Sequence, residues 1–140
     1  MPPRPKAHLI DTNVILRYLI GDIPAQATRA AALMERLELG TERAEIGETV
    51  IAEAVWTLES FYQVRRAEIA EKLATILSFR GVGAPKKGLL ISALARFGST
   101  SADFVDCLLA AKAQQRNLTV YSFDERDFRR LGVSWEVPGR

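Results

Sequence analysis

Short apolar runs that end in polar residues alternate along this chain with longer segments of helical periodicity. A chain with this alternation favours a parallel sheet that helices cover on both faces. The apolar runs predict strands at 7–10, 43–47, 118–122 and 132–137, with a brief strand inside 81–88. We expect the first of these strands to be buried. The alternation therefore places the chain in the α/β fold class.

Helical periodicity is clearest in the segment 49–62. Its apolar residues Ile51, Val55, Leu58 and Tyr62 recur at intervals of four, three and four, which places them on one helix face. Similar spacing predicts helices at 14–19, 25–39, 66–79, 89–97 and 100–116, with a helical turn at 124–130.

Three residues mark expected helix boundaries. Thr49 is expected to cap the helix that follows it, Gly98 to break the helix before it, and Asn117 to end the helix 100–116. The chain has 140 residues, no internal repeat and no linker long enough to divide it. We therefore expect residues 1–140 to form a single domain.

The composition excludes several classes of protein. A single cysteine, Cys107, cannot form an internal disulfide, and with His8 as the one histidine a common zinc site is excluded. The net charge of +2 implies no strong general attraction to nucleic acid or membrane. Neither a targeting segment nor an apolar run of membrane-spanning length is visible, so a cytoplasmic protein without membrane contact is expected.

Acidic residues lie where the expected sheet would gather ligands. Asp11 follows the first strand, and Asp124 follows the strand 118–122. Ligands of open parallel sheets bind beyond the carboxyl ends of the strands, so these two carboxylates can meet in space. Glu53 lies near the start of its helix between two alanines. Each acid also has an ordinary structural explanation, as a turn, cap or first-turn residue.

Asp106 is harder to explain structurally, because it interrupts an otherwise apolar helical segment. An unpaired buried carboxylate costs several kcal/mol, so it requires a cation, a hydrogen-bond network or a proton. Asp103 lies one turn earlier on the same face, where it could instead be the third helical residue after a cap at Thr100.

Four carboxylates without histidine or thiolate partners favour a hard cation, Mg²⁺ or Mn²⁺, which binds oxygen ligands and phosphates. Such a metal polarises a phosphodiester and activates water. The chain contains no nucleophile–base pair and no Walker-type phosphate loop. The acids therefore predict metal-dependent phosphodiester chemistry.

Several short motifs in this order resemble the PIN-domain family, specifically the toxin ribonucleases of VapBC toxin–antitoxin pairs. They are Ile10-Asp-Thr-Asn-Val-Ile-Leu-Arg17, Ile51-Ala-Glu-Ala-Val-Trp-Thr-Leu58, Ala102-Asp-Phe-Val-Asp-Cys-Leu-Leu-Ala-Ala111, Tyr121-Ser-Phe-Asp124, and Phe128 with Leu131-Gly-Val133. The resemblance implies a three-layer α/β/α sandwich with a central, mainly parallel sheet.

The resemblance also implies a function, a site and partners. The family's four metal-binding acids fall on Asp11, Glu53, Asp106 and Asp124, and its supporting polar positions on Thr12, Asn13 and Ser122. Asp103 is a supporting candidate, and Asp106 is favoured as the ligand because Cys-Leu-Leu-Ala-Ala follows it. The implied activity is RNA cleavage with Mg²⁺ or Mn²⁺. The implied partners are a cognate VapB-like antitoxin and a second copy, in a homodimer that forms a larger complex with the antitoxin.

The aromatic residues near the helix 49–62 and four basic residues each have two possible roles. Trp56, Phe61 and Tyr62 serve core packing or line a groove for a partner helix. Four cations are either solvated or contact RNA phosphates, namely Arg17, Lys86, Lys87 and Arg96. Two alternative functions are a receiver-like phospho-acceptor domain and a PIN-like binding module without catalysis. A receiver domain has a particular arrangement of acids and a late lysine, and this chain lacks that arrangement.

Overall fold

The structure is a computed structural model that describes residues 7–139. Helices and strands alternate in this range as the sequence predicts. In chain order they are β1 (Ala7–Leu9), α1 (Thr12–Ile20), α2 (Pro24–Leu39), β2 (Arg43–Glu45), α3 (Glu48–Ser60), α4 (Arg66–Leu77), β3 (Val82–Gly83), α5 (Lys87–Ser99), α6 (Phe104–Arg116), β4 (Val120–Tyr121), α7 (Glu125–Leu131) and β5 (Trp135–Glu136).

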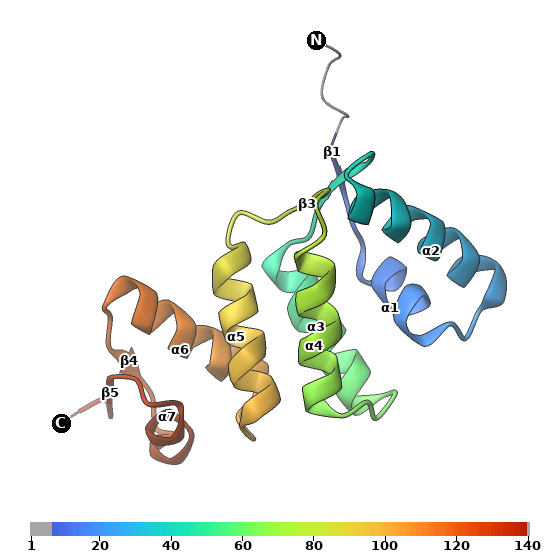
Figure 1. The fold of residues 1–140 in the computed structure, drawn as a ribbon. Coiled ribbons are helices and arrows are strands. Elements are labelled where there is room, and N and C mark those ends of the chain that lie inside the picture. The colour runs from blue at the N-terminus through green and yellow to red at the C-terminus, as the bar shows by residue number, and fades with distance from the viewer. Residues whose placement is uncertain (1–6, 140) are drawn as a thin grey trace, which may run out of the picture.

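All paired strands are parallel, and within residues 7–139 they form two separate sheets. The larger sheet has the order β1-β2-β3, and the smaller one consists of β4 and β5. In Figure 1, α1 and α2 lie to one side of the larger sheet and α3, α4 and α5 to the other. The expected α/β class with parallel strands is confirmed, while β4 and β5 lie on the far side of α5 from β1 (Figure 1).

Local sequence explains the ends of the first two helices. The Asp11 carboxylate accepts a 2.9 Å hydrogen bond from the Thr12 N–H and so caps α1. Pro24 occupies the first turn of α2, where its missing N–H costs no helical bond. Gly40 ends α2 with φ of 82°, a left-handed conformation that favours glycine. The cap at Asp11 fixes the segment that carries Asp11 and Asn13.

The core contains apolar residues from both sheets and from all seven helices of the described range. Helices α4 and α5 pack closely, because a Cβ on Gly98 would lie 2.8 Å from the Cβ of Ala70. Gly98 lies inside α5, so the expectation that it breaks the helix is wrong. Its lack of a side chain permits close helix packing instead.

Three further expectations are corrected at element ends. Strand β1 is exposed along its length, and only Ile10 after it is buried, because β1 is an edge strand. Thr49 lies within α3, whose N-cap is Gly47. Asp103 is the N-cap residue of α6, not its third helical residue, and makes no side-chain capping bond. Asn117 ends α6 in the left-handed region, as expected.

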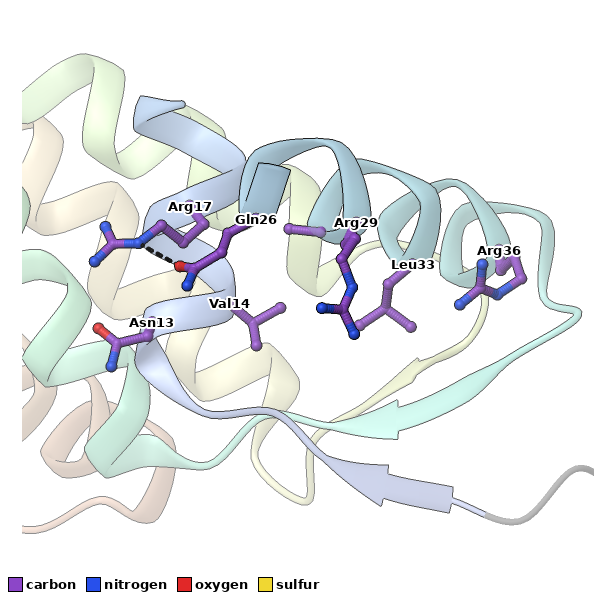
Figure 2. A pocket seen from close by; sticks show the side chains of 8 residues that line it. Asn13, Val14, Arg17, Gln26, Arg29, Leu33 and Arg36 are labelled. Carbon is purple, nitrogen blue, oxygen red and sulfur yellow. Dashed lines mark hydrogen bonds between the residues drawn. The ribbon is translucent and has the colours of Figure 1, made fainter. Parts of the chain in front are cut away.

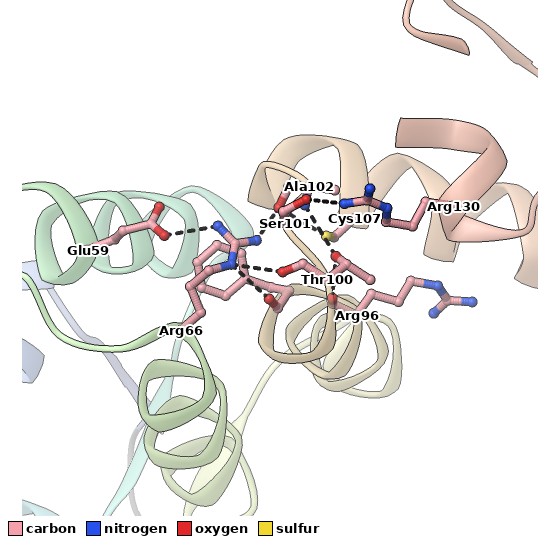
Figure 3. A network of polar contacts seen from close by, with 9 residues as sticks. Glu59, Arg66, Arg96, Thr100, Ser101, Ala102, Cys107 and Arg130 are labelled. Carbon is pink, nitrogen blue, oxygen red and sulfur yellow. Dashed lines mark hydrogen bonds and ion pairs between the residues drawn. The ribbon is translucent and has the colours of Figure 1, made fainter. Parts of the chain in front are cut away.

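Arg66 joins four parts of the fold (Figure 3). Its Nη1 lies 2.9 Å from Glu59 Oε2 on α3, and its Nε donates to the carbonyl oxygens of Phe97 and Thr100 at 3.1 and 3.0 Å. Its Nη2 donates to the carbonyl of Ala102, and its guanidinium lies 3.7 Å from the centre of the Phe97 ring. The start of α6 is therefore held against α3, α4 and α5.

Candidate metal centre and basic groove

Three aspartates meet where α6 and α7 lie together. Asp106 is in the first turn of α6, Asp124 is the N-cap of α7, and Asp127 is in the first turn of α7. One carboxylate oxygen from each lies within 4.8 Å of the other two. The structure therefore brings together two of the residues that the sequence proposed, Asp106 and Asp124, and adds a third.

Hydrogen bonds at the start of α7 hold two of these aspartates, Asp124 and Asp127, in place. The Asp124 Oδ1 accepts a 3.0 Å bond from the Asp127 N–H, which is an ordinary N-terminal cap. The Ser122 hydroxyl accepts a 2.9 Å bond from the Asp124 N–H. The proposed supporting residue Ser122 thus fixes the backbone of Asp124 and does not reach into the carboxylate group.

The carboxylates repel one another and have little positive charge nearby. Burial raises the pKa of Asp106, and the negative charges of Asp103, Asp124 and Asp127 raise it further. Within residues 7–139, none of these four aspartates forms an ion pair with lysine, arginine or histidine. Clustered carboxylate oxygens without a cationic side chain suit Mg²⁺ or Mn²⁺, so the donor set fits the metal that the sequence suggests.

Asp11 and Glu53 lie outside this group of carboxylates. Asp11 is exposed beyond the end of β1, where it caps α1, and Glu53 is exposed on α3. Neither belongs to the cluster of oxygens, and neither is among the charges that act on Asp106. Asp11 follows β1 and Asp124 follows β4, and these strands belong to different sheets. The expected meeting of these two acids therefore does not occur within the single chain.

Asp127 was missed by the sequence reasoning, although a signal for it existed. It follows Asp124 by three residues at the start of a helix, as Asp106 follows Asp103. Residues three apart share one side of a helical turn, so each pair presents two carboxylates in one direction. This repeated spacing could have identified Asp127.

A groove of about 470 Å³ lies between α1 and α2 and is lined by three arginines, Arg17, Arg29 and Arg36 (Figure 2). Arg17 is held by Gln26 and by Asp22, each at 3.1 Å. Asn13 lies at one end of the groove, two residues after Asp11. The groove therefore begins beside one of the proposed acids and continues along basic side chains.

The other cations singled out in the sequence make contacts within the protein. Lys86 lies 3.8 Å from Glu48, and Lys87 donates to the Val82 carbonyl at 2.6 Å. Arg96 donates to Ser92 and Gln114. Compared with these residues, Arg29 in the groove is the better placed for an external anion.

The aromatic residues of the α3 region divide between the two roles expected of them. Trp56 and Phe61 are exposed. Tyr62 is half-buried against the core and donates a 3.0 Å hydrogen bond to Asp22. Phe61 packs edge-on against the Tyr62 ring with the two centres 4.8 Å apart. Trp56 and Phe61 are thus the two aromatic side chains of this region that a partner could contact.

Comparison with known proteins relates this chain to one family and to a ribonuclease. The model of the PIN domain matches residues 8–133. A VapC ribonuclease of Aquifex aeolicus (strain VF5) is 32% identical over 131 residues, which cover 93% of this chain and 96% of that protein. Between residues 7 and 139, no helix combines the length and apolar character needed to cross a membrane.

Proposed function

Because this chain belongs to the PIN-domain family and is a VapC-like ribonuclease, we propose that it is a metal-dependent endoribonuclease and the toxin of a toxin–antitoxin pair. One observation carries the proposal of metal dependence, namely the cluster of Asp106, Asp124 and Asp127. The family match favours this function over a receiver-like phospho-acceptor. As a ribonuclease toxin it would act in the cytoplasm, with residues 1–140 forming one catalytic domain.

We assign the metal to the carboxylates of Asp106, Asp124 and Asp127, joined in the active form by Asp11 and Glu53. Bound there, Mg²⁺ or Mn²⁺ would polarise the phosphodiester and lower the pKa of the attacking water. The protein's own contribution is to hold the carboxylates in place. Asp124 is fixed by its bonds to Ser122 and Asp127, and Asp106 is fixed by the anchored start of α6.

RNA is the proposed substrate, and the groove beside Asn13 is the proposed path of its backbone. Arg29 and Arg36 would contact phosphates there by their charge, while Leu33 offers an apolar surface to a base. The proposal rests on the position of the groove next to Asp11 and on its three arginines.

The proposed partners are a VapB-like antitoxin and a second copy of this chain. The antitoxin would place an arginine or lysine against the carboxylate cluster and an apolar segment against Trp56 and Phe61. These two side chains have 67% and 73% of their surface exposed, which is unusual for large aromatic residues without a partner. Inhibition would then be occupation of the site, in competition with the metal.

Metal dependence is tested on the purified protein free of antitoxin. Mn²⁺ binding is measured by titration calorimetry, and cleavage of a labelled RNA is measured with and without EDTA. Asp106→Asn and Asp127→Asn should weaken Mn²⁺ binding at least tenfold, whereas the exposed α4 control Glu68→Gln should not change it. Cleavage that survives exhaustive chelation would overturn the proposal, and Mn²⁺ binding without cleavage would favour a non-catalytic binding module.

A further inference from the structure

In the part of the chain that the structure describes, each of the two parallel sheets ends in a strand with one unpaired side, β1 in the larger sheet and β4 in the smaller one. Within residues 7–139, β1 pairs only with β2 and β4 only with β5. The Ile10 N–H donates toward β2, so the backbone groups of Leu9 face the opposite, open side. The N–H groups of Val120 and Ser122 donate toward β5, so those of Tyr121 face the open side of β4.

Large apolar side chains are exposed along these two open edges. Leu9 on β1 is 83% exposed, Tyr121 on β4 is 73% exposed and Phe123 beyond it is 78% exposed. Leu118 before β4 is 48% exposed. Edge strands of soluble proteins are usually shielded by charge, proline or a covering element, and an apolar open edge is a template for another strand. The open edges therefore require an explanation.

The two edges cannot join within one chain while the helices keep their observed packing. Arg66 holds the start of α6 against α3, α4 and α5, and Lys112 further along α6 lies 2.9 Å from Glu48 of α3. Only residues 117–119 connect α6 to β4, and three residues span about 10 Å at most. Figure 1 shows β4 on the far side of α5 from β1, so α6 would have to detach before they could pair.

We propose that two copies of this chain exchange their C-terminal sheets, so that β4 of each copy pairs in parallel with β1 of the other. The exchange is two-fold symmetric, since each copy offers the same two edges. It joins the three-stranded and two-stranded sheets into a continuous five-stranded parallel sheet, and it buries Leu9 and Tyr121 on both copies.

The exchange also completes the acidic site, a consequence that rests on the proposed function. In a parallel pair the carboxyl ends of both strands lie at the same edge of the sheet. Asp11 follows β1 and Asp124 follows β4, so Asp11 of one copy would meet Asp106, Asp124 and Asp127 of the other. Each active site is then composite, and the isolated chain has only part of its acids in place.

The interface is tested first by cross-linking, without any measurement of activity. The double variant Leu9→Cys/Tyr121→Cys is treated with a short bis-maleimide and run on a denaturing gel. Strand exchange gives covalent dimers. A cross-linked monomer would show that β4 pairs with β1 of its own chain, and absence of any cross-link would show that the edges stay apart; both results overturn the proposal. Wild-type protein and Leu9→Cys alone are the controls, since Cys107 is buried.

A second test uses charge on the open edges and light scattering. Leu9→Lys and Tyr121→Lys should convert a dimer to a monomer, because a desolvated lysine opposes pairing while an exposed one leaves the single chain folded. Leu39→Lys, at an exposed leucine at the end of α2, should remain dimeric. Dimers that persist in both edge variants would show that the copies associate elsewhere.

Complementation between inactive variants tests the composite site. A mixed dimer of Asp11→Asn and Asp124→Asn copies contains one site with all wild-type acids, so unfolding and refolding the mixture should restore about a quarter of wild-type cleavage. A mixture of Asp106→Asn and Asp124→Asn has no intact site and should stay inactive. Cross-linked dimers that lack cleavage would refute the proposed function alone, whereas cleavage by a wild-type monomer would refute the exchange alone.

Discussion

Asp106 is the residue whose environment most clearly separates a structural from a metal-binding role. It is half-buried in the first turn of α6, and its pKa is raised first by burial and then by the negative charges of three neighbouring aspartates. A half-buried carboxylate among other acids would be stabilised by a basic partner, and no lysine, arginine or histidine pairs with it within residues 7–139. Its surroundings therefore disfavour the ionised form of its carboxyl group, as is typical of a site that binds a cation.

Asp106→Asn should raise the melting temperature of the metal-free protein slightly at neutral pH and remove most cleavage activity. Because the pKa of Asp106 is raised above its ordinary value of 3.8, the folded chain holds this proton more tightly than the unfolded chain. The free energy of unfolding therefore falls as the pH rises from about 3.8 through the folded-state pKa.

Calorimetric melting in EDTA between pH 3.5 and 7.5 checks this sign. The gap between Asp106→Asn and wild type should be widest at pH 7.5 and should close toward the acid end. Asp103→Asn, at an exposed position, should show a smaller gap and retain more cleavage activity. A destabilised Asp106→Asn protein at neutral pH would mean that the carboxylate has a stabilising partner.

At the scale of elements, the contact between α4 and α5 depends on Gly98. A methyl group there would lie 2.8 Å from the Cβ of Ala70, well inside normal contact. We expect Gly98→Ala to lower the free energy of unfolding by about 1–3 kcal/mol, as overpacking does in a rigid interface. Urea unfolding measures this effect.

Gly88 provides the matched control in the same helix, since a methyl group there meets no atom within 4 Å. Gly88→Ala should stabilise by roughly 0.5 kcal/mol through the unfolded state. Adding Ala70→Gly to Gly98→Ala should recover part of the loss. If Gly98→Ala were as stable as Gly88→Ala, the helices would be further apart than the structure places them.

The sequence predicted well which segments form helices and which form strands. It predicted the ends of these elements only where the cause of the end is local. Asn117 was predicted to end α6 because asparagine tolerates the left-handed conformation that it adopts there, with φ of 54°. The prediction that Gly98 breaks a helix was wrong, because glycine is needed at this position for close packing against Ala70, which belongs to another helix. Thr49 was misread because Gly47 already serves as the N-cap of α3. Packing between distant segments has no signature in a single local stretch of sequence.

At the scale of the whole molecule, Arg66 fixes how the start of α6 packs against α3, α4 and α5. It contacts Glu59 and three backbone carbonyls, a pattern that fits the planar guanidinium and not an ammonium group. We expect Arg66→Lys to cost about 2–3 kcal/mol of unfolding free energy, because the carbonyl of buried Ala102 loses its guanidinium donor and keeps only the weak bond from the Cys107 thiol. Thermal and urea unfolding measure this loss.

Arg65→Lys is the control for the Arg66 prediction. Arg65 is the exposed neighbour that precedes α4, and its replacement should change stability by less than about 0.5 kcal/mol. Equal effects of the two substitutions would mean that the contacts of Arg66 contribute nothing specific.

The groove between α1 and α2 sets how RNA would lie across the molecule. Arg29→Gln should weaken binding of a single-stranded RNA and lower the slope of log affinity against log salt by about 0.7, the value for one lost phosphate contact. Fluorescence anisotropy at several salt concentrations measures both quantities. Lys72→Gln, on the exposed surface of α4, should leave the slope unchanged; a slope unchanged in Arg29→Gln would place the RNA elsewhere.

The site was partly predictable at this scale. The closeness of Asp106 and Asp124 follows from the motifs that carry them, and Asp127 follows from its spacing. The distance of Asp11 and Glu53 from that cluster does not, because it depends on where α6 packs. That packing is set by contacts of Arg66 with residues more than thirty positions away in sequence, such as Thr100 and Ala102. A single sequence contains no signal for such contacts.

The short link at residues 117–119 joins α6 to the C-terminal segment formed by β4, α7 and β5. β4, α7 and β5 attach to the rest through buried Val120, Phe128 and Leu131, through Trp135, which packs against the core, and through the bond from Arg130 to Ser101. In a chain that has not exchanged its C-terminal sheet, this segment should unfold locally at a lower free energy than α4 and α5, and its amide protons should exchange first. A single protease cut in the link would separate the chain segment that carries Asp124 and Asp127 from the one that carries Asp106. Degradation could therefore inactivate the nuclease permanently well before the protein disappears.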